Sequence, residues 1–116
     1  MELEEFWKIE NGEYIRTKEG LIGTFEAYAD NYYINYKNIS GWHEQFVDKE
    51  DITKHSKNII DLIEVGDFVG NCEIQYIHKN EKGETLLEND DVTLTEKDIE
   101  TIVTREQFDS IKYEVE

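Results

Sequence analysis

The chain has 116 residues, of which 28 are Asp or Glu and 12 are Lys or Arg, giving a formal net charge of -16. A balance this acidic is common in disordered chains, but 38% hydrophobic and 12% aromatic residues supply enough apolar surface for a folded core. The negative potential excludes direct binding to DNA, RNA or anionic membranes and favours basic protein partners, above all basic grooves that hold nucleic acid.

Alternation of apolar and polar residues with period two predicts most of the secondary structure as strands. The first clear runs cover residues 24–29 and 32–37. Between them, Ala29-Asp30-Asn31 predicts a tight hairpin, because Asp and Asn tolerate a positive φ. Lys18-Glu19-Gly20 predicts an earlier turn.

The second half of the chain continues the strand pattern and adds a little helix. Strands over 73–79 and 84–88 are expected around a turn at 80–84. Asn58 is placed to cap a short turn over 59–62. Near the end of the chain, we expect strands over 99–103 and 111–115.

A short helix over 105–110 is expected between those last two strands. Thr104 and Gln107 have the spacing of a capping box, with Thr104 as the N-cap residue. This helix would pack Phe108 inward, towards the core.

Two segments 54 residues apart resemble each other. Ile9–Ile15 (IENGEYI) and Ile63–Val69 (IEVGDFV) are identical or chemically similar at six of seven positions. The shared Gly-acid-aromatic step is typical of a strand start in small SH3-like barrels. It predicts an awkward backbone conformation at Gly66 and a buried Phe68. The match indicates either two related modules, 1–57 and 58–116, or a coincidence within one sheet.

The predicted fold is therefore a single acidic domain over residues 1–116 that is mainly β. It is either a small SH3-like barrel or a bent antiparallel sheet, with one short C-terminal helix. Two related modules within it stay open as an alternative.

Most aromatic side chains are expected in the core of this β domain: Phe6, Trp7, Phe25, Tyr32, Tyr33, Tyr36, Phe46, Phe68 and Phe108. However, neighbouring residues of a strand point to opposite faces, so Tyr32 and Tyr33 cannot both be buried by one core. Residues 38–51 lack clean periodicity, and an exposed Trp42 there would make a good interface anchor. Tyr33 and Trp42 are the candidate aromatic contacts for a partner.

Acidic residues are densest late in the chain, where residues 81–116 hold 12 acids and four bases. Alternate strand residues lie ~6.5–7 Å apart, a spacing comparable with that of phosphates along a nucleic-acid strand. Carboxylates along one edge could therefore contact a basic groove. The alternative is solubility and protection of the edge against aggregation. The candidate acidic contacts are Glu81, Glu84, Glu88, Asp90, Asp91, Glu96, Asp98 and Glu100.

Motifs of catalysis and of metal or cofactor binding are absent from the sequence. His43, His55 and His78 form no zinc-binding pattern, and residues 88–91 lack the glycine and final glutamate of a calcium loop. No phosphate-binding loop or nucleophile motif occurs, so we expect no enzyme, no cofactor and no metal. Cys72, the single cysteine, is interpreted as a small buried hydrophobe in a reducing compartment.

The first ten residues lack the basic and apolar regions of a signal peptide, and no apolar run is long enough to cross a bilayer. These features favour a cytoplasmic location.

Two stretches resemble a set of small, mostly uncharacterised proteins encoded by phages and prophages of Gram-positive bacteria. They are Lys54–Val69 (KHSKNIIDLIEVGDFV) and Glu100–Glu116 (ETIVTREQFDSIKYEVE), which together cover about a third of the chain. The resemblance implies a phage context in a bacterial host cytoplasm. It implies no chemistry and transfers no catalytic residue.

Charge and resemblance together favour a non-enzymatic phage protein that binds and inhibits a bacterial defence protein. An anti-CRISPR protein that mimics nucleic acid in the basic channel of a Cas effector is one form of this hypothesis. The first alternative is a phage assembly adaptor of SH3-like type. The second is a protein that sequesters a small ligand, although an anionic signalling nucleotide would be repelled by this chain.

Overall fold

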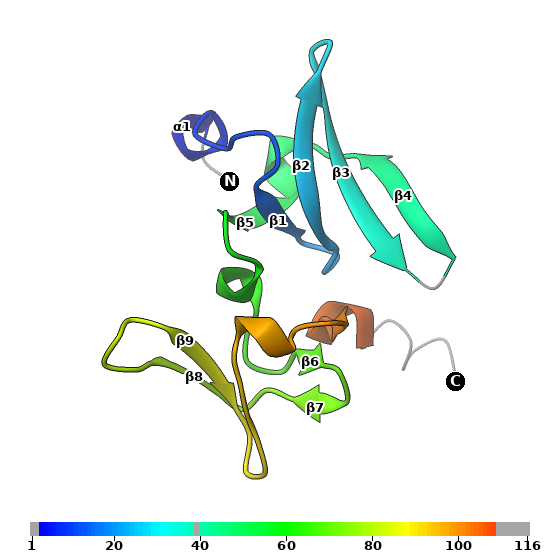
Figure 1. Cartoon of the computed structure of the whole chain (residues 1–116). Helices are drawn as coiled ribbons and strands as arrows, with labels where there is room; N and C mark the ends of the chain where they lie inside the picture. Colours follow the sequence, from blue (N-terminus) through cyan, green and yellow to red (C-terminus); the bar gives the residue numbers. More distant parts are fainter. Residues whose placement is uncertain (1–2, 39, 109–116) are drawn as a thin grey trace. The chain divides into compact units, whose positions relative to one another are not determined.

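The computed structural model describes residues 3–38 and 40–108 (Figure 1). Antiparallel strands dominate it, which confirms the prediction of a mainly β fold. No sheet closes into a barrel among the described residues, so a bent sheet is the better of the two predicted forms. The predicted strand over 111–115 lies outside the described residues. The chain divides into two compact units, Met1–Asn58 and Ile59–Glu116.

Unit 1 (Met1–Asn58) is built on one five-stranded antiparallel sheet in the order β4-β3-β2-β1-β5. A short helix precedes this sheet, and a single 3-10 turn leads into its last strand. The elements are α1 (Leu3–Phe6), β1 (Tyr14–Thr17), β2 (Ile22–Tyr28), β3 (Asn31–Asn38), β4 (Gly41–Phe46), η1 (Lys49–Asp51) and β5 (Ile52–Ser56).

The core of unit 1 lies on one face of this sheet. Phe25 on β2 and Ile34 on β3 are direct cross-strand partners, and both are buried. Phe6 of α1 packs edge-on against Phe25 and against Tyr32, with ring centroids 5.9 and 4.8 Å apart. Edge-to-face pairs of this kind are favoured by the aromatic quadrupole. The helix therefore covers the apolar face of the sheet.

The predicted hairpin after β2 is present, shifted by one residue. Ala29 and Asp30 adopt positive φ values of 49° and 66°, so they form the two-residue turn. Asn31 already belongs to β3, and its side-chain amide donates to the Ala29 carbonyl oxygen at 3.3 Å. The turn predicted at 18–20 is confirmed by a hydrogen bond from the Gly20 N–H to the Thr17 carbonyl oxygen.

Unit 2 (Ile59–Glu116) holds two small antiparallel sheets, in the orders β10-β9-β8 and β11-β6-β7. The helical residues 105–108 follow its last strand. Its elements are η2 (Ile59–Leu62), β6 (Phe68–Val69), β7 (Cys72–Glu73), β8 (Tyr76–Lys79), β9 (Thr85–Glu88), β10 (Thr93–Leu94), η3 (Glu96–Asp98) and β11 (Ile102–Val103).

The prediction of a single strand over 73–79 is wrong, because the chain passes from one sheet of unit 2 to the other within these residues. The Ile74 N–H donates to the Asp67 carbonyl oxygen, whereas the Gln75 N–H donates to the Glu88 carbonyl oxygen. Cys72–Glu73 and Tyr76–Lys79 are thus separate strands, β7 and β8. Alternation continues across the break, so the pattern alone could not reveal it.

The predicted capping box at Thr104 and the predicted short turn over 59–62, which is η2, are both confirmed. The Thr104 N–H donates to Gln107 Oε1 at 3.1 Å, and the Gln107 N–H donates to Thr104 Oγ1 at 3.3 Å. However, the strand before this helix covers only Ile102–Val103 and not 99–103. Ile99 still belongs to the end of η3 (Glu96–Asp98), where its N–H donates to the Glu96 carbonyl oxygen at 3.2 Å.

Several aromatic residues predicted for the core are not buried. Trp7, Phe46 and Phe108 are 65%, 68% and 46% exposed, respectively. Phe68 is half-buried and its ring lies 5.0 Å from that of Phe108, so the prediction of a buried Phe68 is wrong. The next residue, Val69, is the buried side chain of β6. Cys72 is half-buried as well.

The seven-residue repeat adopts one turn with the same hydrogen bonds in both units. Gly12 and Gly66 have φ values of 92° and 97°, which confirms the prediction for Gly66. The Glu13 carboxylate accepts from the Glu10 N–H at 2.5 Å, and the Asp67 carboxylate accepts from the Glu64 N–H at 2.7 Å. The match in sequence is thus also a match in turn geometry.

Each repeat turn is also held by main-chain hydrogen bonds to one residue further along the chain. The Gly12 N–H donates to the Phe25 carbonyl oxygen at 2.9 Å, and the Gly66 N–H donates to the Ile74 carbonyl oxygen at 2.8 Å. In return, Phe25 N–H donates to the Glu13 carbonyl oxygen and Ile74 N–H to that of Asp67, both at 2.8 Å. A common origin of the two units stays a prediction.

Candidate functional site

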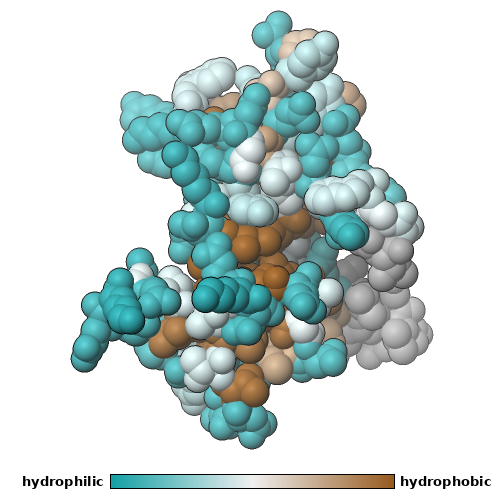
Figure 2. Space-filling model, in the orientation of Figure 1, coloured by the Kyte–Doolittle hydropathy of each residue, from teal (hydrophilic) through white to brown (hydrophobic). Residues whose placement is uncertain are grey.

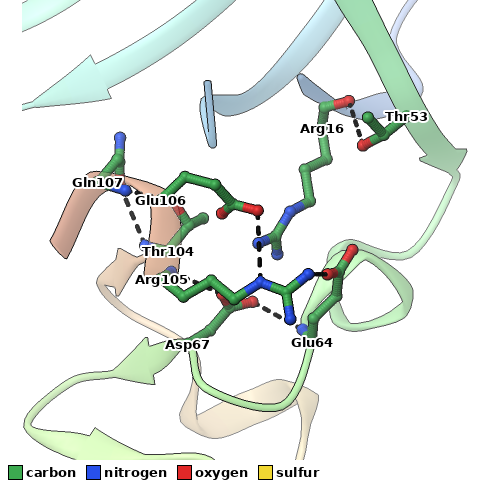
Figure 3. A network of polar contacts seen from close by, with 8 residues as sticks. All are labelled: Arg16, Thr53, Glu64, Asp67, Thr104, Arg105, Glu106 and Gln107. Carbon is green, nitrogen blue, oxygen red and sulfur yellow. Dashed lines mark hydrogen bonds and ion pairs between the residues drawn. The ribbon is translucent and has the colours of Figure 1, made fainter. Parts of the chain in front are cut away.

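The buried carboxylates of the repeat, Asp67 and Glu13, hold local structure through hydrogen bonds. Asp67 is 0% exposed, and it accepts hydrogen bonds from the Glu64 N–H and from the Arg105 N–H, the latter at 3.0 Å (Figure 3). The Arg105 guanidinium in turn donates to Glu64 Oε1 at 2.6 Å. Asp67 therefore ties the 64–67 turn to the start of the C-terminal helix, and both its carboxylate oxygens are occupied.

Glu13 has the equivalent place in unit 1. Its Oε1 lies 3.1 Å from His55 Nδ1, and His55 Nε2 lies 3.3 Å from Glu5 Oε2. Burial raises the pKa of Glu13. Hydrogen bonds from the Glu10 N–H and from His55 lower the pKa by more than burial raises it, so the pKa is lowered overall. His55 holds β5 to the repeat turn by hydrogen bonds, which is a structural role.

The predicted acidic residues do not follow one sheet edge. Strand β9 is the central strand of its sheet, and the acids gather at its two ends. Glu81 and Glu84 lie in or beside the β8–β9 turn, whereas Asp90 and Asp91 lie in the β9–β10 turn. Hydrophilic side chains cover both turns (Figure 2). Glu96 and Asp98 belong to η3, and Glu100 follows it.

Glu88 and Asp98 are engaged in contacts within unit 2. Glu88 is half-buried, with Oε1 3.0 Å from His78 Nε2 and 3.3 Å from Thr93 Oγ1. The hydrogen bond between the Glu88 carboxylate and the His78 ring lowers the pKa of Glu88 and raises the pKa of His78. Asp98 accepts from the Thr95 N–H at 2.8 Å and so caps η3. These two carboxylates are poor candidates for contacts with a partner.

The other predicted acids are exposed, and most of them are unpaired. Glu84 receives only a long hydrogen bond of 3.5 Å from the Asn80 side chain. Of these predicted acids, five have exposed carboxylates that form neither an ion pair nor a hydrogen bond with any described residue: Glu81, Asp90, Asp91, Glu96 and Glu100. Unit 2 contains 16 acidic and five basic residues, a net charge of -11, against 12 and seven, a net of -5, in unit 1.

The predicted aromatic contacts, Tyr33 and Trp42, share the face of the unit 1 sheet opposite the buried Phe25 and Ile34. Trp42 is 71% exposed, opposite Lys37 on β3. Tyr33 is half-buried against its cross-strand partner Phe46, with ring centroids 4.9 Å apart. Phe46 was assigned to the core, yet its place four residues after Trp42 puts both on one strand face.

Tyr28, at the end of β2, adds a further exposed side chain to this sheet. Sequence reasoning missed it because the residue alternates regularly with apolar neighbours.

Among residues 3–38 and 40–108, no group of three or more His, Cys, Asp or Glu side chains is arranged to hold a metal ion. In the same residues, no helix has the length and apolar character needed to span a membrane. Comparison with protein-family models, with curated proteins and with solved structures finds no match to this chain.

Proposed function

We propose that this chain is a non-enzymatic binding protein whose unit 2 docks on the basic, nucleic-acid-binding surface of another protein and thereby inhibits it. The observation that carries the proposal is the set of exposed, unpaired carboxylates on unit 2, at a net charge of -11. Carboxylates without internal partners lose no ion pair on docking. They are therefore free to pair with the Lys and Arg residues that would otherwise bind phosphates.

The phage-like stretches suggest which protein is inhibited. A phage protein that blocks a basic nucleic-acid channel acts most usefully on a bacterial defence nuclease, for example a Cas effector in the host cytoplasm. The acidic turns at the two ends of β9 would occupy positions that phosphates take in the channel.

A phage assembly adaptor is the second candidate function. It is favoured by the exposed aromatic side chains of unit 1, since Trp and Phe anchors are typical of ordinary protein interfaces. The two functions differ in which unit carries the binding energy.

A double charge reversal in unit 2 tests the proposal. We expect Asp90→Lys with Asp91→Lys to lower affinity at least about tenfold for the partner captured from host lysate, because attractive pairs become repulsive. Wild-type affinity should also fall with salt, since screening acts over ~8–10 Å at physiological ionic strength. Titration calorimetry at two salt concentrations measures both effects.

The matched control is Glu4→Lys with Glu19→Lys, which changes the net charge equally at exposed positions of unit 1. This variant should bind within about twofold of wild type, because only long-range steering is altered. Equal losses in both double variants would contradict a specific role for unit 2. If the Asp90/Asp91 reversal leaves the affinity unchanged and Trp42→Ala abolishes binding, the assembly adaptor would be the better candidate.

A further inference from the structure

In the part of the chain that the structure describes, strand β4 is an edge of the unit 1 sheet. It pairs with β3 on one side, and no described strand pairs with its other side. An open edge presents unpaired N–H and C=O groups to which another chain can add as a strand. Proteins commonly protect such edges with proline, bulges or several charges, but Gly41–Phe46 contains a single acidic residue, Glu44, and no proline.

The register shows which main-chain groups point outward. The Val47 N–H donates to the Tyr32 carbonyl oxygen, so Tyr32 and Val47 form a hydrogen-bonded pair. Hydrogen-bonded and non-hydrogen-bonded pairs alternate along an antiparallel ladder. The N–H and C=O groups of His43 and Gln45 therefore face β3, and those of Trp42, Glu44 and Phe46 face away from the sheet.

The residues with outward main-chain groups also carry the exposed side chains. Trp42 and Phe46 are 71% and 68% exposed, and Glu44 between them is exposed as well. All three project from the sheet face opposite the core, because the buried Ile34 pairs with Gln45. An added strand would thus meet, in order, an aromatic, an acidic and an aromatic side chain on one face.

We propose that β4 binds an extended segment of a partner protein by strand addition. On the face of Trp42, Glu44 and Phe46, this segment would carry an apolar residue, then Lys or Arg, then an apolar residue. Main-chain hydrogen bonds along the edge would provide the affinity, and the three side chains would determine which partner sequences bind. The site lies in unit 1 and uses main-chain groups, so it goes beyond the acidic surface of unit 2.

A second copy of this chain is a worse occupant of the edge than a basic segment. Antiparallel pairing of two β4 strands centred on Glu44 would place the two Glu44 carboxylates opposite each other, which is destabilising. Each copy also carries a net charge of -16. A basic segment instead complements both the local and the overall charge.

A seven-residue peptide of alternating design, Thr-Val-Thr-Arg-Thr-Val-Thr, is the probe. We expect its titration into the ¹⁵N-labelled chain to shift the amide signals of Trp42, Glu44 and Phe46 and to slow their hydrogen exchange. The amides of His43 and Gln45, already bonded to β3, should change much less. Replacement of the peptide Arg by Glu should weaken binding about tenfold, because Glu44 then faces a like charge.

Two variants separate the main-chain contribution from the charge. Glu44→Pro removes an outward N–H that β3 does not use, so the sheet should survive while binding of the peptide is lost. Glu44→Gln keeps that N–H and should weaken binding only about threefold to fivefold. If Glu44→Pro perturbs the sheet signals, Trp42→Ala takes its place and should weaken binding about tenfold.

Absence of shifts at Trp42, Glu44 and Phe46 would overturn strand addition, as would equal binding of the Arg and Glu peptides. A dimer in light scattering, with these amides already protected, would overturn the basic segment as the occupant. The Asp90/Asp91 reversal should leave peptide binding nearly unchanged. The strand-addition proposal can therefore fail or hold independently of the acidic-surface proposal.

Discussion

Asp67→Ala is expected to destabilise unit 2 by about 3–5 kcal/mol. The Asp67 carboxylate is 0% exposed and is the acceptor for the N–H groups of Glu64 and Arg105. Removal of the carboxylate leaves two donors without their acceptor and opens a cavity at the junction of the repeat turn and the C-terminal helix. Each unsatisfied buried donor costs about 1–3 kcal/mol. Hydrogen exchange, followed separately in the two units, measures the loss.

Two further variants show whether the loss of stability in Asp67→Ala comes from its missing carboxylate oxygens. Asp67→Asn keeps one oxygen, that of the side-chain amide, as a hydrogen-bond acceptor. This variant should therefore lose about half as much stability as Asp67→Ala. Asp90→Ala removes an exposed, unpaired carboxylate and should change stability by less than about 0.5 kcal/mol. A similar small effect of Asp67→Ala would show that the repeat turn does not depend on its carboxylate.

Gly23→Ala is expected to destabilise unit 1 by about 3 kcal/mol or more. A methyl group at this position of β2 would lie 2.2 Å from the Asn35 carbonyl oxygen and 2.9 Å from Ile34 Cγ1. The first of these atoms is backbone in the neighbouring strand β3, so relief requires the two strands to separate. The free energy of unfolding, from hydrogen exchange of unit 1, measures the effect.

Gly41→Ala is the matched control in the same unit. Gly41 has a φ of 110°, and apart from Gly41 and its two chain neighbours no described residue has an atom within 4 Å of the position that a methyl group would take. Its substitution should cost only the strain of the positive φ, about 1–2 kcal/mol. Equal losses at Gly23 and Gly41 would mean that β2 and β3 are less closely apposed around Gly23.

Local sequence signals predicted local structure well. The capping box of Thr104 and Gln107 and the turn glycine Gly66 depend on a few adjacent residues, and the structure has both. The hairpin after β2 was displaced by one residue because Ala29, rather than Asn31, takes the positive φ. Turn position depends on the strand register, which the sequence of the turn does not contain.

Burial was harder to predict because it depends on what covers each face. Tyr33 and Phe46 lie on the sheet face opposite α1, so aromatic character alone wrongly placed Phe46 in the core. Similarly, the acids of residues 81–100 are dense in sequence but separate in space, since β9 carries them to opposite ends of a sheet. Glu88 differs from the rest because β9 places it beside His78 on β8.

Competition with nucleic acid is the most direct test of the acidic-surface proposal. A labelled DNA duplex bound to the captured partner is titrated with this chain, and the anisotropy of the DNA is followed. We predict that the wild-type chain displaces the duplex, that the Glu4/Glu19 reversal also displaces it, and that the Asp90/Asp91 reversal does not. A ternary complex of partner, duplex and wild-type chain would contradict the proposal, because the chain would then occupy a different surface from the DNA.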